Sequence, residues 1–157
     1  MIQAIYASPL QRALYTAQAI ARHHQLEVQT DPSLKEIDAG ELEGLPLDEL
    51  RSYLSELIAD KYEDEEISRR YGGETAAKVQ ERAWSTIQSI IGKHHDGVIV
   101  IVSHYFVILT VICFVLNLPV SEMGRLKLGV GSISTIVFEE RGPRLTLFND
   151  DCHLPNK

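Results

Sequence analysis

His104 has the sequence context of a functional residue. It follows Val98–Val102, a β-branched run typical of a strand buried on both faces, and precedes Phe106–Leu116, an apolar run that indicates a buried helix. Ligands in open α/β sheets bind at the carboxyl ends of the strands, so a histidine at this junction is a candidate site residue. The alternative is a core histidine that hydrogen-bonds to nearby backbone. Its neighbour Ser103 can cap the helix that follows.

Two further side chains could act together with His104. Arg12 lies in the first turns of a helix predicted after the strand Ile2–Ala7, where its guanidinium could hold a phosphate through two parallel hydrogen bonds. Glu36 is one of several carboxylates in the segment Leu34–Gly40. Taken alone, each has a simpler interpretation, because arginines on helices and carboxylates in loops are mostly exposed to water.

The elements that must position these residues alternate between strand and helix. Ser8 and Pro9 predict a helix start, with Ser8 as the N-cap and Pro9 in the first helical position. Thr75 can cap a later helix in the same way. In chain order, hydrophobic periodicity predicts a strand at Ile2–Ala7, a helix from Pro9, a strand at Leu26–Val28, helices at Leu47–Ala59 and Ala76–Lys93, a strand at Val98–Val102, a helix at Phe106–Leu116, and a hairpin of Ile133–Glu139 with Leu145–Phe148.

This alternation predicts the fold class. Helices interleaved with buried strands indicate a three-layer α/β/α arrangement with a mainly parallel sheet, and the last two strands form a C-terminal edge hairpin. The chain has 157 residues, 45% of them hydrophobic, and shows no repeat or linker, so we expect a single domain spanning residues 1–157.

Composition and charge argue against several kinds of partner. The net charge of −7 is unlike that of a nucleic-acid binder, which needs clustered Lys and Arg. The apolar run Val98–Leu118 approaches the length of a membrane span, but Ser103, His104 and Asn117 interrupt it. Two cysteines cannot form a disulfide framework for a chain of this size, and no signal peptide is visible. We therefore expect a cytoplasmic protein without a membrane or nucleic-acid partner.

The order of several short motifs is more specific than any one of them. In chain order they are Ser8-Pro9-Leu10-Gln11-Arg12-Ala13 with Thr16-Ala17, Leu34-Lys35-Glu36, Gly40-Glu41-Leu42-Glu43-Gly44, Gly73-Glu74-Thr75, Val102-Ser103-His104 and Asn149-Asp150-Asp151-Cys152-His153-Leu154. This order resembles the histidine phosphatase superfamily, which includes the cofactor-dependent phosphoglycerate mutases. The resemblance runs the whole length of the chain.

The resemblance implies a phosphomonoester hydrolase that works through a phosphohistidine. By resemblance, Arg12 matches the second phosphate-binding arginine, Glu36 the acid that protonates the leaving oxygen, and His104 the second histidine, which stabilises charge on the transferring phosphoryl group. Tyr105 stands where the family often has glycine, and its amide can still donate to phosphate. No metal or other cofactor is expected, because cationic side chains and backbone amides can stabilise the developing charge.

The sequence departs from the family by lacking its Arg-His-Gly motif, whose histidine is the nucleophile. No histidine here follows an arginine and precedes a glycine, and the motif belongs upstream of Ser8-Pro9-Leu10. The resemblance therefore implies that the family's first strand would lie before Met1, that the domain is N-terminally incomplete, and that the chain as written is inactive. Strands beside a missing central strand keep unpaired edges, so we expect a homodimer.

Other interpretations remain open. The chain could be a non-catalytic phosphate-binding or scaffold module that kept the pocket without the nucleophile, or it could be a phosphoglycerate mutase. Metal binding by His23-His24, His94-His95 and Cys152-His153 is weaker, because adjacent residues lack the spacing of structural zinc sites. The expected partner is a small phosphate ester, which the sequence does not identify further.

Overall fold

The computed structural model describes residues 1–46, 49, 68, 70–94 and 96–155. The predicted helix Leu47–Ala59 falls almost wholly outside them. The elements are strands β1 (Ile2–Ala7), β2 (Val28–Thr30), β3 (Val98–Val102), β4 (Ile133–Glu139) and β5 (Gly142–Asp150), helices α1 (Gln11–His24), α4 (Ala76–Lys93) and α5 (Tyr105–Val115), and short 3-10 helices at Pro32–Leu34, Gly40–Leu42 and Val120–Arg125.

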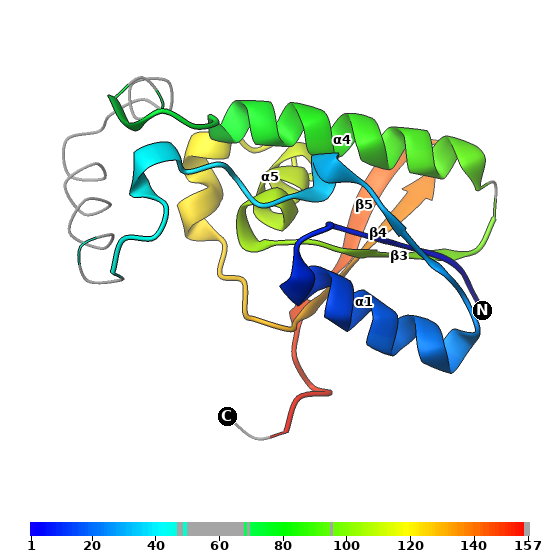
Figure 1. Cartoon of the computed structure of the whole chain (residues 1–157). Coiled ribbons are helices and arrows are strands. Elements are labelled where there is room, and N and C mark those ends of the chain that lie inside the picture. The colour runs from blue at the N-terminus through cyan, green and yellow to red at the C-terminus, as the bar shows by residue number, and fades with distance from the viewer. Residues whose placement is uncertain (47–48, 50–67, 69, 95, 156–157) are drawn as a thin grey trace.

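The predicted parallel sheet is present. β1 pairs in parallel with β2 on one side and with β3 on the other, giving the order β2-β1-β3. In the register, Ala7 lies opposite Thr30 and Val102, so the three strands end at one edge. Helix α1 lies on one face of this sheet and α4 on the other (Figure 1). The fold is therefore the expected layered α/β arrangement.

Alternating side chains of β1 pack against the two helical layers. Ile5 and Ala7 face α1, where they contact its small residues Ala17 and Ala21. Ala4 and Tyr6 point to the other face, in a cluster with Ile90 of α4, as expected for a strand with period two. The small side chains of α1 let the helix approach the strand closely. This packing fixes the position of the first turn of α1 relative to the end of β1.

The C-terminal hairpin is also confirmed. β4 and β5 form a separate two-stranded antiparallel sheet. Ile136 of β4 packs against the cluster that α4 and α5 form with Val79 and Val107, and Trp84 of α4 stacks on Phe138 with ring centroids 6.1 Å apart. The hairpin thus covers helices rather than extending the parallel sheet. β5 begins three residues earlier than predicted.

The predicted start of α1 was wrong. The N-cap is Leu10, with extended backbone, and the helix begins at Gln11, not at Pro9. Ser8 is fully buried, and its hydroxyl accepts a hydrogen bond from the Leu10 amide at 3.2 Å. Ser8 therefore shapes a turn before the helix.

The second strand was misplaced by two residues. Leu26 packs in the cluster with α1, and the pairing with β1 starts only at Val28.

β3 differs from the expected fully buried strand. Val100 and Val102 face the α1 layer, while Ile99 and Ile101 face the α4 layer, so both faces are covered. Its residues are nevertheless only half-buried, and Val98 is 53% exposed. Among the described strands β3 pairs with β1 alone, which leaves its other edge open.

In the described part of the chain, no helix combines the length and apolar character that a bilayer crossing requires.

Candidate active site

The candidate site lies where the three parallel strands end. Ser8 follows β1, and its amide donates to the carbonyl of Val102 at the end of β3, at 2.9 Å. The amide of Asp31, after β2, donates to the carbonyl of Ala7 at 3.0 Å. These bonds extend the pairing past the strands and bring together the segments that carry Arg12, Glu36 and His104. This edge is where open α/β sheets bind ligands.

His104 is held through both ring nitrogens. Its Nδ1 accepts a hydrogen bond from Nε of Arg12 at 3.2 Å, and its Nε2 lies 2.7 Å from the hydroxyl of Ser8. Because a guanidinium can only donate, Nδ1 must be unprotonated, and a neutral ring then carries its proton on Nε2 and donates to Ser8. His104 is therefore anchored by side chains, and not by backbone as the alternative interpretation held.

Electrostatics favour the neutral ring. His104 is 6% exposed, and burial, followed by the positive charges of Arg12 and Arg82, lowers its pKa to about 4. An anion placed beside the ring would oppose these effects and raise the pKa again. The site thus combines nearby positive charge with a histidine that can take up a proton when an anion binds.

Glu36 reaches the amino end of α5, immediately beyond His104. Its Oε1 accepts hydrogen bonds from the amides of Ile37 at 2.9 Å and Phe106 at 3.2 Å. Burial raises the pKa of the Glu36 carboxyl, although those amides and the charge of Arg12 act in the opposite direction. The structure therefore brings Glu36 to the same strand edge as the Arg12–His104 pair, where burial raises the pKa of its carboxyl above the ordinary value.

Arg12 and Tyr105 occupy the rim of this site. Arg12 is exposed overall, yet its guanidinium turns inward to His104. The amide of Tyr105 is directed at the Glu36 carboxyl and helps to lower its pKa, while the ring is 45% exposed and packs edge-on against Phe106 at 5.4 Å. All four predicted site residues are thus close in space, with the Tyr105 amide facing Glu36.

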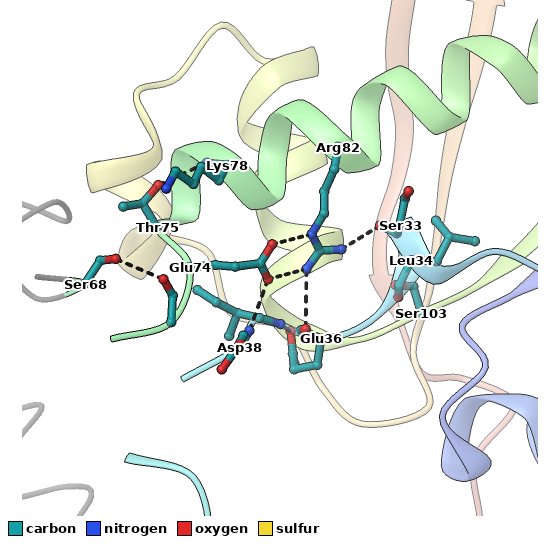
Figure 2. Close-up of polar contacts among 12 residues, drawn as sticks. Ser33, Leu34, Glu36, Asp38, Ser68, Glu74, Thr75, Lys78, Arg82 and Ser103 are labelled. Carbon is teal, nitrogen blue, oxygen red and sulfur yellow. Dashed lines mark hydrogen bonds and ion pairs between the residues drawn. The ribbon is translucent and has the colours of Figure 1, made fainter. Parts of the chain in front are cut away.

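Sequence reasoning missed the residues that support the site. Ser103 does not cap α5, whose N-cap is His104. Its hydroxyl instead donates to the carbonyl of Leu34 at 2.8 Å, which ties the Glu36 segment to the end of β3. Arg82 of α4 and Glu74 form an ion pair at 2.8 Å beside the same segment (Figure 2). The sequence did not reveal the contact between Arg82 and Glu74, because an arginine on an amphipathic helix is usually exposed to water.

Metal binding finds no support in the described residues, where no three His, Cys, Asp or Glu side chains are placed to hold an ion. His94, one of the adjacent histidines, contacts the hydroxyl of Tyr6 at 3.1 Å through its Nε2. Both cysteines are free thiols. The polar groups that meet at the site are the Arg12 guanidinium, the His104 ring and the half-buried Glu36 carboxyl.

A family model described as the histidine phosphatase superfamily, branch 1, matches residues 1–151. The chain belongs to the histidine phosphatase superfamily. Among solved structures of this fold, Bacillus stearothermophilus YhfR superposes with a TM-score of 0.86 at 25% identity, over 98% of this chain and 77% of its own. A mutant phosphoserine phosphatase from Entamoeba histolytica in complex with phosphoserine gives a TM-score of 0.83 at 30% identity, over 98% and 76%.

Curated relatives place this histidine phosphatase chain among phosphatases and mutase-like proteins. Phosphoserine phosphatase 1 of Hydrogenobacter thermophilus is 29% identical over 153 residues, which cover 98% of this chain and 72% of that protein. Phosphoglycerate mutase-like protein 4 of Arabidopsis thaliana is 36% identical over 107 residues, which cover 66% of this chain and 46% of that protein. The chain thus spans from under half to about three quarters of the relatives that it matches.

Proposed function

We propose that this strand edge is the phosphoryl-binding centre of a phosphomonoester hydrolase. The observation that carries the proposal is the Arg12–His104 hydrogen bond of 3.2 Å beside the half-buried carboxyl of Glu36. Phosphoryl transfer needs positioned cationic donors around the equatorial oxygens and an acid for the leaving oxygen. The three side chains supply both, at the edge of the sheet where a ligand of this fold class binds.

Each residue has a distinct role in this proposal. The guanidinium of Arg12 donates to phosphoryl oxygens, and His104 adds a second donor once Nδ1 is protonated. Glu36, whose pKa is raised by burial, gives its proton to the leaving alkoxide. The amide of Tyr105, at the start of α5, is directed at the Glu36 carboxyl in the free site, and in this proposal it donates to the bound oxyanion instead.

Phosphate entry exchanges one hydrogen bond for two. In the free site, Nε of Arg12 donates to Nδ1 of His104, so neither group is committed to a ligand. A phosphate dianion between them accepts from the guanidinium and raises the pKa of His104 from about 4, so that Nδ1 takes up a proton and donates as well. Binding is therefore accompanied by proton uptake at pH values above about 4, where the His104 ring is neutral in the free site.

The described histidines do not supply a nucleophile. Both nitrogens of His104 are bonded within the site, and His94 contacts Tyr6. His23 and His24 lie in the last turn of α1, at the opposite end of the helix from Arg12, and His153 is exposed in a turn that follows β5. We therefore propose that residues 1–157 bind phosphate esters without turning them over, and that hydrolysis through a phosphohistidine requires an Arg-His-Gly segment placed beside His104.

The proposed substrate is a small phosphate ester. The phosphatase of Entamoeba histolytica was solved in complex with phosphoserine and with 3-phosphoglyceric acid, both compact monoesters that carry a carboxylate. Phosphoserine is therefore the first ester to test. If residues 1–157 serve as a binding module, they retain affinity for such esters and gain no activity from an added nucleophile.

The test compares residues 1–157 with a version that carries an added N-terminal strand ending in Arg-His-Gly. We expect both to bind inorganic phosphate, and only the extended version to hydrolyse phosphoserine and a chromogenic phosphate monoester. Arg12→Ala and His104→Ala should weaken phosphate binding in both versions. Turnover by the short chain, or no phosphate binding by either version, would overturn the proposal.

A further inference from the structure

One arginine makes four hydrogen bonds beside the segment from Ser33 to Asp38, which carries Glu36. Arg82 of α4 donates from Nε and Nη2 to the two carboxylate oxygens of Glu74, each at 2.8 Å. Its Nη1 donates to the carbonyl of Ser33 at 2.6 Å, and its Nη2 to the carbonyl of Glu36 at 3.3 Å. Figure 2 shows the guanidinium extending from α4 to the segment that carries Glu36.

Glu74 holds the same segment from its other end. Its Oε2 accepts from the amide of Asp38 at 3.1 Å, and its own amide donates to the carbonyl of Asp38 at 2.8 Å. The pair is therefore bonded to backbone groups on both sides of Glu36 and to the carbonyl of Glu36 itself. A third element, the end of β3, holds Leu34 through Ser103.

This pair differs from the other ion pairs among the described residues. The side chains of Arg82 and Glu74 are 21% and 27% exposed, against 64% and 45% for Arg144 and Glu139. An exposed ion pair with one hydrogen bond contributes little to stability. An arginine that makes two hydrogen bonds to a carboxylate and also donates to backbone carbonyls holds these groups in a defined arrangement. The Arg144–Glu139 pair offers a matched control.

We propose that the Arg82–Glu74 pair is a positioning device that aims the Glu36 carboxyl at the amino end of α5. Arg82 and Glu74 touch no reacting atom in this arrangement. They hold the backbone from Ser33 to Asp38, and that backbone determines whether Oε1 of Glu36 reaches the amide of Phe106 at 3.2 Å. The inference rests on the proposed role of Glu36 as the acid of the reaction.

The charges are consistent with a permanent pair. Its hydrogen bonds with Arg82 hold the pKa of Glu74 below the usual value, so the carboxylate stays ionised at neutral pH. The charge of Arg82 also contributes to the low pKa of His104. Loss of Arg82 should therefore release Glu36 and, as a separate electrostatic effect, raise the pKa of His104.

The test follows the Phe106 amide, the Glu36 carboxyl and inorganic phosphate binding by NMR in residues 1–157. We expect Arg82→Met to speed hydrogen exchange of the Phe106 amide about five- to tenfold, as the loss of one hydrogen bond predicts. The pKa of Glu36 should fall toward its ordinary value as burial is lost. Arg82→Lys keeps the positive charge but cannot make the two parallel hydrogen bonds of a guanidinium. It should therefore also speed exchange of the Phe106 amide and lower the pKa of Glu36. Arg144→Met should produce neither.

Phosphate binding separates this inference from the proposed function. With Arg12 and His104 intact, phosphate affinity should stay within about twofold of wild type in Arg82→Lys, since lysine keeps the positive charge that acts on His104. Wild-type protein that binds no phosphate would defeat the proposed function and leave the Phe106 and Glu36 measurements valid.

A second variant covers the case in which Arg82→Met does not fold. Glu74→Gln removes the charge but little volume, and it must speed hydrogen exchange of the Phe106 amide in the same way. Unchanged exchange at Phe106 and an unchanged Glu36 pKa in Arg82→Lys and Glu74→Gln would overturn the inference.

Discussion

Nε of Arg12 and Nδ1 of His104 are joined by a hydrogen bond of 3.2 Å that links the first turn of α1 to the end of β3. The sequence separates the two residues by 92 positions, and the parallel pairing of β1 with β3 brings them together. Because the guanidinium keeps its positive charge, it disfavours a second positive charge on the imidazole. Arg12 therefore favours the neutral state of His104 before any ligand binds.

Removing the Arg12 side chain should show this coupling directly. In Arg12→Ala, the pKa of His104 should rise above its wild-type value of about 4, because one of the charges that lowers it is gone. Inorganic phosphate should bind roughly ten- to a hundredfold more weakly, the loss expected for a charged hydrogen-bond donor. NMR titration of the imidazole and of phosphate measures both. Arg22→Ala, an exposed cation in the last turn of the same helix, should change neither.

His104 also makes stability depend on pH in a defined window. Its pKa is about 4 in the folded chain against an ordinary 6.5, so between these values the unfolded chain binds more protons. The contribution of His104 to stability is therefore complete above pH 6.5, falls as pH decreases, and is lost near pH 4. The total for a shift of this size is about 3 kcal/mol. Denaturant unfolding across this window measures it.

His104→Gln provides the comparison for that experiment. Glu36 has a raised pKa and contributes the opposite slope, since its folded form holds a proton that the unfolded form releases. Only the difference between wild type and His104→Gln isolates the histidine. The difference should shrink steadily from pH 6.5 to 4. A difference that is constant across this window would contradict the low pKa of His104.

Much of the fold could be predicted because single strands and helices carry their own pattern. The run Val98–Val102 was placed correctly by its β-branched residues, and α4 by its apolar spacing and by Thr75, whose hydroxyl accepts from the amide of Lys78 at 3.1 Å. The start of α1 was misplaced because Ser-Pro is a favourable helix start in general, whereas here the Ser8 hydroxyl bonds to the Leu10 amide and lies against His104. Tertiary contact decided the local conformation.

The candidate site was less predictable from sequence, for a physical reason. His104 was singled out by its position between a buried strand and a buried helix, whereas Arg12 and Glu36 were found through motif order, since nothing in their local patterns distinguishes them from exposed residues. Arg82 carried no signal at all: its role depends on backbone carbonyls of Ser33 and Glu36, more than 45 residues away in the chain. Because every residue has a backbone carbonyl, a side chain that donates to one has no partner residue type that could be recognised in the sequence.

Two adjacent glycines test how closely the Glu74 segment must approach the Glu36 segment. Gly72 and Gly73 both have positive φ, of 73° and 82°. A Cβ on Gly72 would meet nothing within 4 Å, whereas one on Gly73 would collide with the backbone of Asp38 and Gly40. Gly72→Ala should therefore cost only the left-handed backbone penalty of about 1–2 kcal/mol. Gly73→Ala should cost more and should also speed exchange of the Phe106 amide.

Gly92→Ala is the control for this pair. Gly92 lies inside α4 with nothing within 4 Å of an added Cβ, so alanine should stabilise the helix by about 0.5–1 kcal/mol. The three variants together separate helix propensity, backbone strain and steric contact. Equal effects of Gly72→Ala and Gly73→Ala on the unfolding free energy and on the Phe106 amide would show that the two segments need not approach closely.

The open edge of β3 and the exposed hairpin predict self-association. Among the described strands, β3 is paired on one side only, and the hairpin exposes Val137 at 37% and Leu147 at 40%. An unpaired strand edge is a site for pairing with another chain, and exposed apolar side chains on the hairpin add a second surface for such contact. We expect residues 1–157 to form a homodimer in light scattering, and Val137→Lys to shift it to monomer. Tyr15→Lys, on α1 and 62% exposed, should leave the mass unchanged. A monodisperse wild-type monomer would show that the edge is protected in solution.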